Sequence, residues 1–143
     1  MLLALGAPLA AAPKDDAIAE ALAAIARGDG VAAEVAGRRA MDQGASRAEV
    51  AALIGEGELL QGDLADARTW LADKDFAADT RARGLHALAR LELLEDNFEA
   101  AAEAFDLRLA EGEPTAELWV DIGRMRYRGG EHVLALDAAE KAV

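Results

Sequence analysis

The chain has 143 residues, of which 53% are apolar and 4% aromatic, and its formal net charge is −12. This length fits a single domain, and the negative charge argues against nucleic acid and anionic membrane surfaces as partners, because both attract basic proteins. The lack of cysteine excludes disulfides, thiolate metal sites and cysteine nucleophiles. Alanine supplies much of the apolar content and runs of β-branched residues are missing, so we expect an all-α fold.

The first feature along the chain is an uncharged apolar run from Leu2 to Ala12, which is followed by Pro13 and charged residues. Ala10 and Ala12 fit the small-residue pattern of a signal-peptidase site, but the run lacks a basic start and is too short to span a bilayer. Residues 1–13 are interpreted either as the remnant of a signal peptide or as an apolar or disordered N-terminal segment. The first alternative predicts a periplasmic or exported protein, and the second predicts a cytoplasmic one.

Eight helices are expected over the rest of the chain, from the spacing of apolar residues and the glycines and prolines between them. Their expected ranges are 15–27, 31–43, 47–61, 64–73, 80–95, 98–111, 115–128 and 131–142. Ser46 and Glu49 form a capping-box pattern at the start of the third helix. Gly44, Gly112 and Pro114 are typical of the breaks between helices.

A period of 34 residues runs through these helices. Turn residues that tolerate a positive φ recur at this spacing, and they are Gly28, Gly62, Asp96 and Gly130. The second helix of each pair has an alanine in phase, at Ala33, Ala67, Ala101 and Ala135. Small residues also recur in the first helices, at Gly55, Ala89 and Gly123. Because small residues let two backbones approach closely, each repeat is predicted to be an antiparallel helix pair.

With this period the chain resembles the tetratricopeptide repeat (TPR) family, whose pattern is W-x2-L-G-x2-Y, then A-x3-F, then P. The matching residues are Trp119, Ile122 and Gly123 for the first part, Ala101 and Phe105 for the second, and Pro114 for the proline. The chain departs from the pattern at Arg126, which stands in the tyrosine position. It also departs at Glu20 and Gly37, which replace an apolar and an aromatic residue in the first repeat.

The resemblance covers residues 14–143 and implies an α-solenoid, a right-handed superhelix of antiparallel helix pairs. The implied repeats span about 14–47, 48–81, 82–115 and 116–143. In this family the first helix of each pair lines a concave groove that binds proteins or peptides. The resemblance therefore implies a protein or peptide partner.

Six residues are carried over to this groove as candidate ligand-binding residues, and they are Arg83, His86, Arg90, Arg124, Tyr127 and Arg128. Guanidinium groups suit carboxylates, so we expect an acidic or carboxylate-bearing ligand. The sequence leaves open an alternative, in which these arginines pair with neighbouring acids such as Glu56, Glu92 and Asp121.

No motif for catalysis, a cofactor or a metal is found. His86 and His132 do not have metal-ligand spacing, and no glycine-rich phosphate loop follows a strand. We therefore expect no catalytic, cofactor-binding or metal-binding residues, and a non-catalytic scaffold for protein–protein interaction. The alternatives are a structural or self-associating segment of a longer TPR array and an enzyme with an unrecognised site.

The last predicted helix carries more apolar side chains than one helix pair can cover, and they are Val133, Leu134, Leu136, Ala139, Ala142 and Val143. In stacked repeats the terminal unit needs a polar outer face. We therefore expect this face to be covered, either by a further repeat of a longer native chain or by a second copy in a homo-oligomer.

Overall fold

The computed structural model describes residues 11–143, which form eight α-helices and no strand. The helices are α1 Pro13–Ala26, α2 Gly30–Asp42, α3 Arg47–Gln61, α4 Leu64–Leu71, α5 Arg81–Leu94, α6 Phe98–Leu109, α7 Ala116–Arg128 and α8 His132–Lys141. The described part is therefore all-α, as expected, and each helix begins and ends within two residues of its predicted bounds. The predicted apolar run lies outside the described residues except for Ala11 and Ala12. None of the helices within residues 11–143 is long and apolar enough to cross a membrane.

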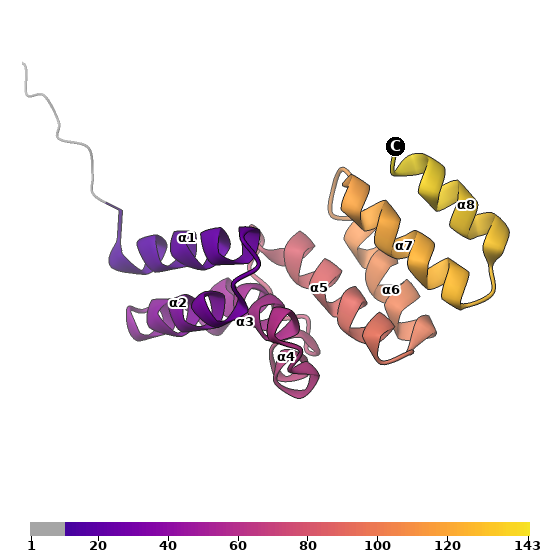
Figure 1. The fold of residues 1–143 in the computed structure, drawn as a ribbon. Coiled ribbons are helices and arrows are strands. Elements are labelled where there is room, and N and C mark those ends of the chain that lie inside the picture. Colours follow the sequence, from indigo (N-terminus) through magenta and orange to yellow (C-terminus); the bar gives the residue numbers. More distant parts are fainter. Residues whose placement is uncertain (1–10) are drawn as a thin grey trace, which may run out of the picture.

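Consecutive helices pack in pairs, α1 with α2, α3 with α4, α5 with α6 and α7 with α8 (Figure 1). The first helix of each pair also contacts the first helix of the next pair, so α3 lies against α1, α5 against α3 and α7 against α5. The second helix of a pair contacts the first helix of the next pair in the same way. The pairs therefore follow one another along the molecule, with α1 and α8 at opposite ends (Figure 1).

The turn inside each pair has a positive φ at the predicted position. Gly28, Gly62, Asp96 and Gly130 have φ angles of 75°, 80°, 61° and 81°. Glycine adopts such angles without a steric cost, and aspartate is among the few other residues that tolerate them. The spacing of 34 residues is thus present in the backbone as well as in the sequence.

The small residues in phase do not all have the same role. A Cβ on Gly55 of α3 would lie 2.5 Å from Cδ2 of the buried Leu71 of α4, so these two helices leave no room for a side chain. A Cβ on Gly123 of α7 would lie 3.5 Å from the carbonyl oxygen of Ala135, which is an ordinary contact. The contact between the two helices of a pair is therefore tighter at Gly55 than at Gly123. The reason is that the residue equivalent to Leu71 in α8 is Ala139, whose side chain is much smaller.

Helix α3 begins with the predicted capping box. The main-chain N–H of Glu49 donates to Oγ of Ser46 at 3.3 Å, and the N–H of Ser46 donates to Oε2 of Glu49 at 2.8 Å. Nζ of Lys14 in α1 lies 2.8 Å from Oε1 of Glu49. The hydrogen bonds from Lys14 and then from Ser46 lower the pKa of Glu49 to about 2. The cap of α3 thus also ties α3 to the start of α1.

Candidate functional site

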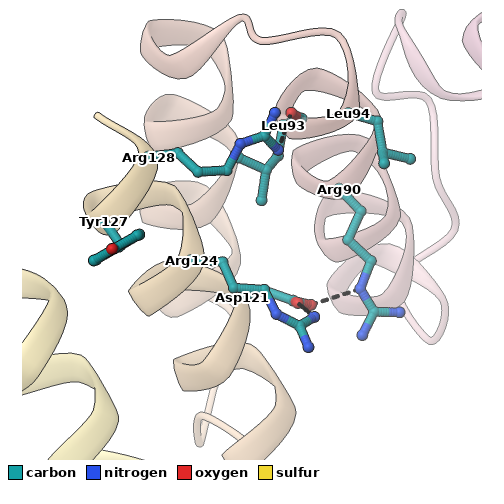
Figure 2. Close-up of a pocket in the computed structure, with 7 residues that line it drawn as sticks. All are labelled: Arg90, Leu93, Leu94, Asp121, Arg124, Tyr127 and Arg128. Carbon is teal, nitrogen blue, oxygen red and sulfur yellow. Dashed lines mark hydrogen bonds and ion pairs between the residues drawn. The ribbon is translucent and has the colours of Figure 1, made fainter. Parts of the chain in front are cut away.

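The six candidate residues lie on α5 and α7 and line two neighbouring pockets. The first pocket has a volume of about 330 Å³ and is lined by Arg90, Leu93, Leu94, Asp121, Arg124, Tyr127 and Arg128 (Figure 2). The second has a volume of about 320 Å³, and Arg83, His86 and Arg90 are among its lining residues. Arg90 lines both pockets. The structure therefore divides the candidates into two groups that meet at Arg90.

A buried carboxylate, Asp121 on α7, holds three of the candidate side chains in place. Its Oδ2 accepts a hydrogen bond from Nε of Arg90 at 2.6 Å and lies 2.9 Å from Nε2 of His86. Its Oδ1 accepts from Nη1 of Arg124 at 3.0 Å. Burial alone would raise the pKa of Asp121, but the hydrogen bonds from His86 and Arg90 outweigh burial, and the pKa is lowered. Asp121 is therefore ionised at neutral pH and links α7 to α5.

The other two candidate arginines are also held by neighbouring groups. Nη1 of Arg83 donates to Oε2 of Glu56 on α3 at 2.8 Å. Nη1 of Arg128 donates to the carbonyl oxygen of Leu93 at 3.1 Å, and its Nη2 pairs with Asp96. The pairing with neighbouring acids that the sequence left open is thus present in the structure. These arginines contribute to the packing of one first helix on the next.

The side of the first pocket that faces solvent is partly apolar and carries an exposed guanidinium group. Tyr127 and Leu94 are 66% and 55% exposed. The side chain of Arg124 is 68% exposed, although its Nη1 reaches Asp121. Figure 2 shows Asp121 and Arg124 on α7 opposite Arg90 on α5. The lining contains three guanidinium groups and the carboxylate of Asp121, and Asp96, which lies outside the lining, pairs with Arg128.

Sequence reasoning missed Arg108, which lines the second pocket. Its stretch of α6 is interpreted from the sequence as core packing, and the side chain is 8% exposed. Nη2 of Arg108 donates to the carbonyl oxygen of Glu113 at 3.2 Å, whereas Nη1 is buried without a partner among the described residues. The sequence signal that could have identified Arg108 is its position among core residues of a helix. A buried guanidinium group needs hydrogen-bond acceptors around it, so such an arginine is unusual.

Glu92, which was expected beside the groove arginines, faces the opposite side of α5. Its oxygens accept from Nη1 and Nη2 of Arg68 on α4, at 2.9 and 3.0 Å, and from Nδ2 of Asn97 at 2.9 Å. The hydrogen bonds from Arg68 outweigh burial and lower the pKa of Glu92. The expectation of Glu92 as a partner for the groove arginines is therefore wrong.

Glu58 occupies the position of α3 that Glu92 occupies in α5, but its surroundings differ. It is 3% exposed, and its Oε1 has no hydrogen-bond partner among the described residues. Burial, followed by the charges of Glu34 and Asp66, raises the pKa of Glu58. Its carboxylate lies within 4.8 Å of those of Asp63 and Asp66. Acidic groups of this kind are common on protein surfaces and by themselves do not indicate a metal ion.

Comparison with known proteins does not add a family or a relative. No protein-family model matches the chain, and a search of the curated proteins gives no match. The resemblance to TPR proteins therefore rests on the residues of the chain and on the arrangement of its helices.

Proposed function

We propose that the chain is a non-catalytic binding scaffold of the TPR type. In this proposal α1, α3, α5 and α7 line the concave groove of a right-handed α-solenoid. The turns with positive φ at a spacing of 34 residues support it. The contact of each first helix with the next also supports it, because stacking in one direction is what a solenoid needs.

The proposed ligand is an acidic peptide or a peptide with a free carboxylate, bound at the pocket between α5 and α7. The observation that carries this proposal is the guanidinium group of Arg124, which lines that pocket, is 68% exposed and shares the carboxylate of Asp121 with Arg90. Arg124 offers an exposed guanidinium, which can bind a carboxylate through two parallel hydrogen bonds. Leu94 and Tyr127 offer exposed apolar surface beside it, so the pocket suits an acidic residue flanked by an apolar one.

The charge that the experiment should remove is that of Arg124. Arg90 is unsuitable, because its Nε lies 2.6 Å from the buried carboxylate of Asp121, and Arg90→Glu would place two carboxylates together. Arg124→Gln removes an exposed charge and leaves the link between α5 and α7 intact. Arg39→Gln on α2 is the matched control, because Arg39 is also exposed and paired with an acid, Glu20.

The test begins with a display library of random peptides with free C-termini, selected on the unmodified protein. We expect the selected peptides to be enriched in Asp and Glu, and to bind Arg124→Gln about tenfold more weakly than Arg39→Gln. Binding should also weaken with added salt, because the charges are exposed. A selection without acidic enrichment, or equal binding by the two variants, would exclude this ligand class.

A further inference from the structure

The outer face of α7 and α8 carries a groove that is open to solvent. It has a volume of about 750 Å³, and its lining is mostly apolar side chains. Among them, Tyr127 is 66% exposed, Leu136 is 62% exposed and Val143 is fully exposed. An open groove with an apolar lining is the kind of surface to which amphipathic helices bind. This α7–α8 groove is a different face from the pocket between α5 and α7, although Arg124 and Tyr127 line both.

The equivalent groove one pair earlier, between α5 and α6, is occupied by α7. Ile122 and Met125 of α7 belong to the same hydrophobic cluster as Phe105 of α6, and Leu109 of α6 packs against that cluster. The residues 34 positions after Phe105 and Leu109 are Ala139 and Val143, and both line the α7–α8 groove. The molecule therefore contains a filled example of the groove that α7 and α8 leave open.

The burial of equivalent residues shows what a bound helix would cover. Leu93 of α5 is 7% exposed beneath α7, whereas the equivalent Tyr127 is 66% exposed. Phe105 of α6 is 1% exposed, whereas the equivalent Ala139 is exposed. The α7–α8 groove thus presents to solvent the positions that α5 and α6 use to bind a helix.

One position in each groove also makes an ion pair with the incoming helix. Glu56 of α3 pairs with Arg83 of α5 at 2.8 Å. The equivalent residue of α5, Arg90, pairs with Asp121 of α7 at 2.6 Å. The next equivalent residue is Arg124, which lines the α7–α8 groove. A helix that enters this groove should therefore carry a carboxylate.

We propose that the α7–α8 groove binds an amphipathic helix of a partner protein with large apolar residues at positions i, i+4 and i+7 and a carboxylate at i+3. This is the pattern that α7 presents to α5 and α6, and its residues are Leu118, Asp121, Ile122 and Met125, all buried. The apolar side chains of the partner helix pack against Leu136 and Val143. Its carboxylate pairs with Arg124.

A second copy of this chain matches the groove less well than such a helix. In a head-to-tail contact, α1 would enter the groove, and its equivalent residues Asp16, Ala19, Glu20 and Ala23 lack large apolar side chains. In a face-to-face contact, Arg124 of one copy would find no carboxylate in the groove of the other, because none of the described residues that line the groove is acidic. A partner helix with a carboxylate has neither disadvantage.

The probe for the experiment is a peptide of residues 115–129, because α7 fills the equivalent groove. Since isolated helices of this length are marginal in water, the peptide carries a hydrocarbon staple on its solvent face, and circular dichroism verifies its helicity. Fluorescence anisotropy should show saturable binding to the full chain. Leu136→Glu should weaken binding by about tenfold, because it places a charge on the apolar floor of the groove.

Three controls separate this site from general effects and from the proposed ligand pocket. Val35→Glu on α2 changes a residue that is 58% exposed, much like Leu136, and should not alter binding. Leu94→Glu changes the pocket between α5 and α7 and should also leave binding of this peptide unchanged. Arg124→Gln should weaken binding about fivefold for the unmodified peptide and much less for a peptide with Asp121→Asn.

Two kinds of result would overturn the proposal. One is the absence of saturable binding by the helical peptide, or equal affinities for the Leu136→Glu and Val35→Glu variants. The other comes from sedimentation equilibrium of the protein alone. A dimer that Leu136→Glu dissociates would assign the groove to a second copy. Because the Leu94→Glu and Leu136→Glu variants affect different faces, failure of this proposal is distinguishable from failure of the proposed function.

Discussion

Glu58 and Glu92 occupy equivalent positions of α3 and α5, and we predict that replacing each with glutamine has opposite effects on stability. Both side chains are buried, with exposed fractions of 3% and 7%. Glu92 accepts hydrogen bonds from Arg68 and Asn97. Oε1 of Glu58 has no such partner among the described residues, and Nη2 of Arg38 lies 3.7 Å from it.

Glu92→Gln should destabilise the protein. The glutamine side chain keeps one acceptor oxygen but turns an NH₂ group toward the donors of Arg68 or Asn97. Hydrogen bonds to a charged group contribute about 1.5–3 kcal/mol each. The side chain of Arg68 is 37% exposed, so water compensates for part of the loss. We therefore expect the free energy of unfolding to fall by about 2 kcal/mol.

Glu58→Gln should stabilise the protein at neutral pH. The ionised carboxylate is buried and lies beside other acids, which is why its pKa is raised. Glutamine has the same shape and no charge, and its NH₂ group can donate to the neighbouring carboxylates. Removing the charge from this buried carboxylate, whose Oε1 has no hydrogen-bond partner among the described residues, should increase the free energy of unfolding by about 1 kcal/mol.

The pH dependence gives each effect a separate signature. The lowered pKa of Glu92 means that its contribution is present above the unfolded pKa of about 4.3 and is lost as the pH falls through the folded value. The raised pKa of Glu58 means that stability present below the unfolded pKa is lost as the pH rises through the folded value. The difference between each variant and the unmodified protein should therefore be largest at neutral pH and small in acid.

Urea unfolding followed by circular dichroism, repeated from neutral pH to a pH below the folded pKa of Glu92, measures both differences. Equal losses of unfolding free energy in the two variants would refute the reasoning. They would show that the effect of the substitution depends on the position in the repeat and not on the groups around the side chain. A gain for Glu58→Gln that persists unchanged in acid would refute the part that depends on its ionisation.

Three further predictions concern packing, the ion pairs and the helix cap. Gly55→Ala should lower the free energy of unfolding by about 1–3 kcal/mol, because its Cβ would lie 2.5 Å from Leu71, whereas Gly123→Ala should be neutral or stabilising; urea melts compare them. Arg90→Gln should cost about 2 kcal/mol by the same assay, because it leaves Asp121 buried with fewer partners, and an unchanged midpoint would contradict this. Ser46→Ala should cost about 1 kcal/mol through loss of the capping box, and Ser46→Asn, which can still cap, should restore most of it.

The turns and helix ends could be predicted from the sequence because they depend on local chemistry. A turn residue must only tolerate a positive φ, and Asp96 satisfies that requirement as the glycines do. A capping box needs two residue types at a fixed spacing, and Ser46 and Glu49 have that spacing in the sequence. The distance between two helices depends on side chains from both of them, so Gly123 alone could not predict it.

The candidate site could be predicted only to the level of a shared face. The period of the repeat placed Arg90 and Arg124 on neighbouring first helices, and both line the pocket between α5 and α7. The period does not determine the side-chain conformations or which partner each charge selects. For that reason the sequence could not show that Asp121 holds Arg90, or that Glu92 faces Arg68 of α4.

The ion pairs between first helices reverse their polarity from one interface to the next, and this reversal predicts specificity in the α7–α8 groove. Glu56 of α3 receives the cation of Arg83, whereas the equivalent Arg90 of α5 receives the carboxylate of Asp121. If a helix with the charges of α5 occupied the groove that α7 fills, its Arg83 would lie near Arg90. Two like charges in close contact repel, so this groove disfavours such a helix.

Arg124 has the sign of Arg90, so the α7–α8 groove should distinguish a peptide of α7 from a peptide of α5. A stapled peptide of residues 81–95 carries Arg83 where α7 has Glu117, and Ala87 where α7 has Asp121. We expect it to bind at least about tenfold more weakly than the peptide of residues 115–129 in the same anisotropy assay. Arg124→Glu should narrow or reverse the preference for the α7 peptide over the α5 peptide. The substitution gives this position a negative charge, as Glu56 does at the equivalent position of α3. Equal binding of the two peptides to the unmodified chain would show that apolar area alone, and not charge, selects the helix.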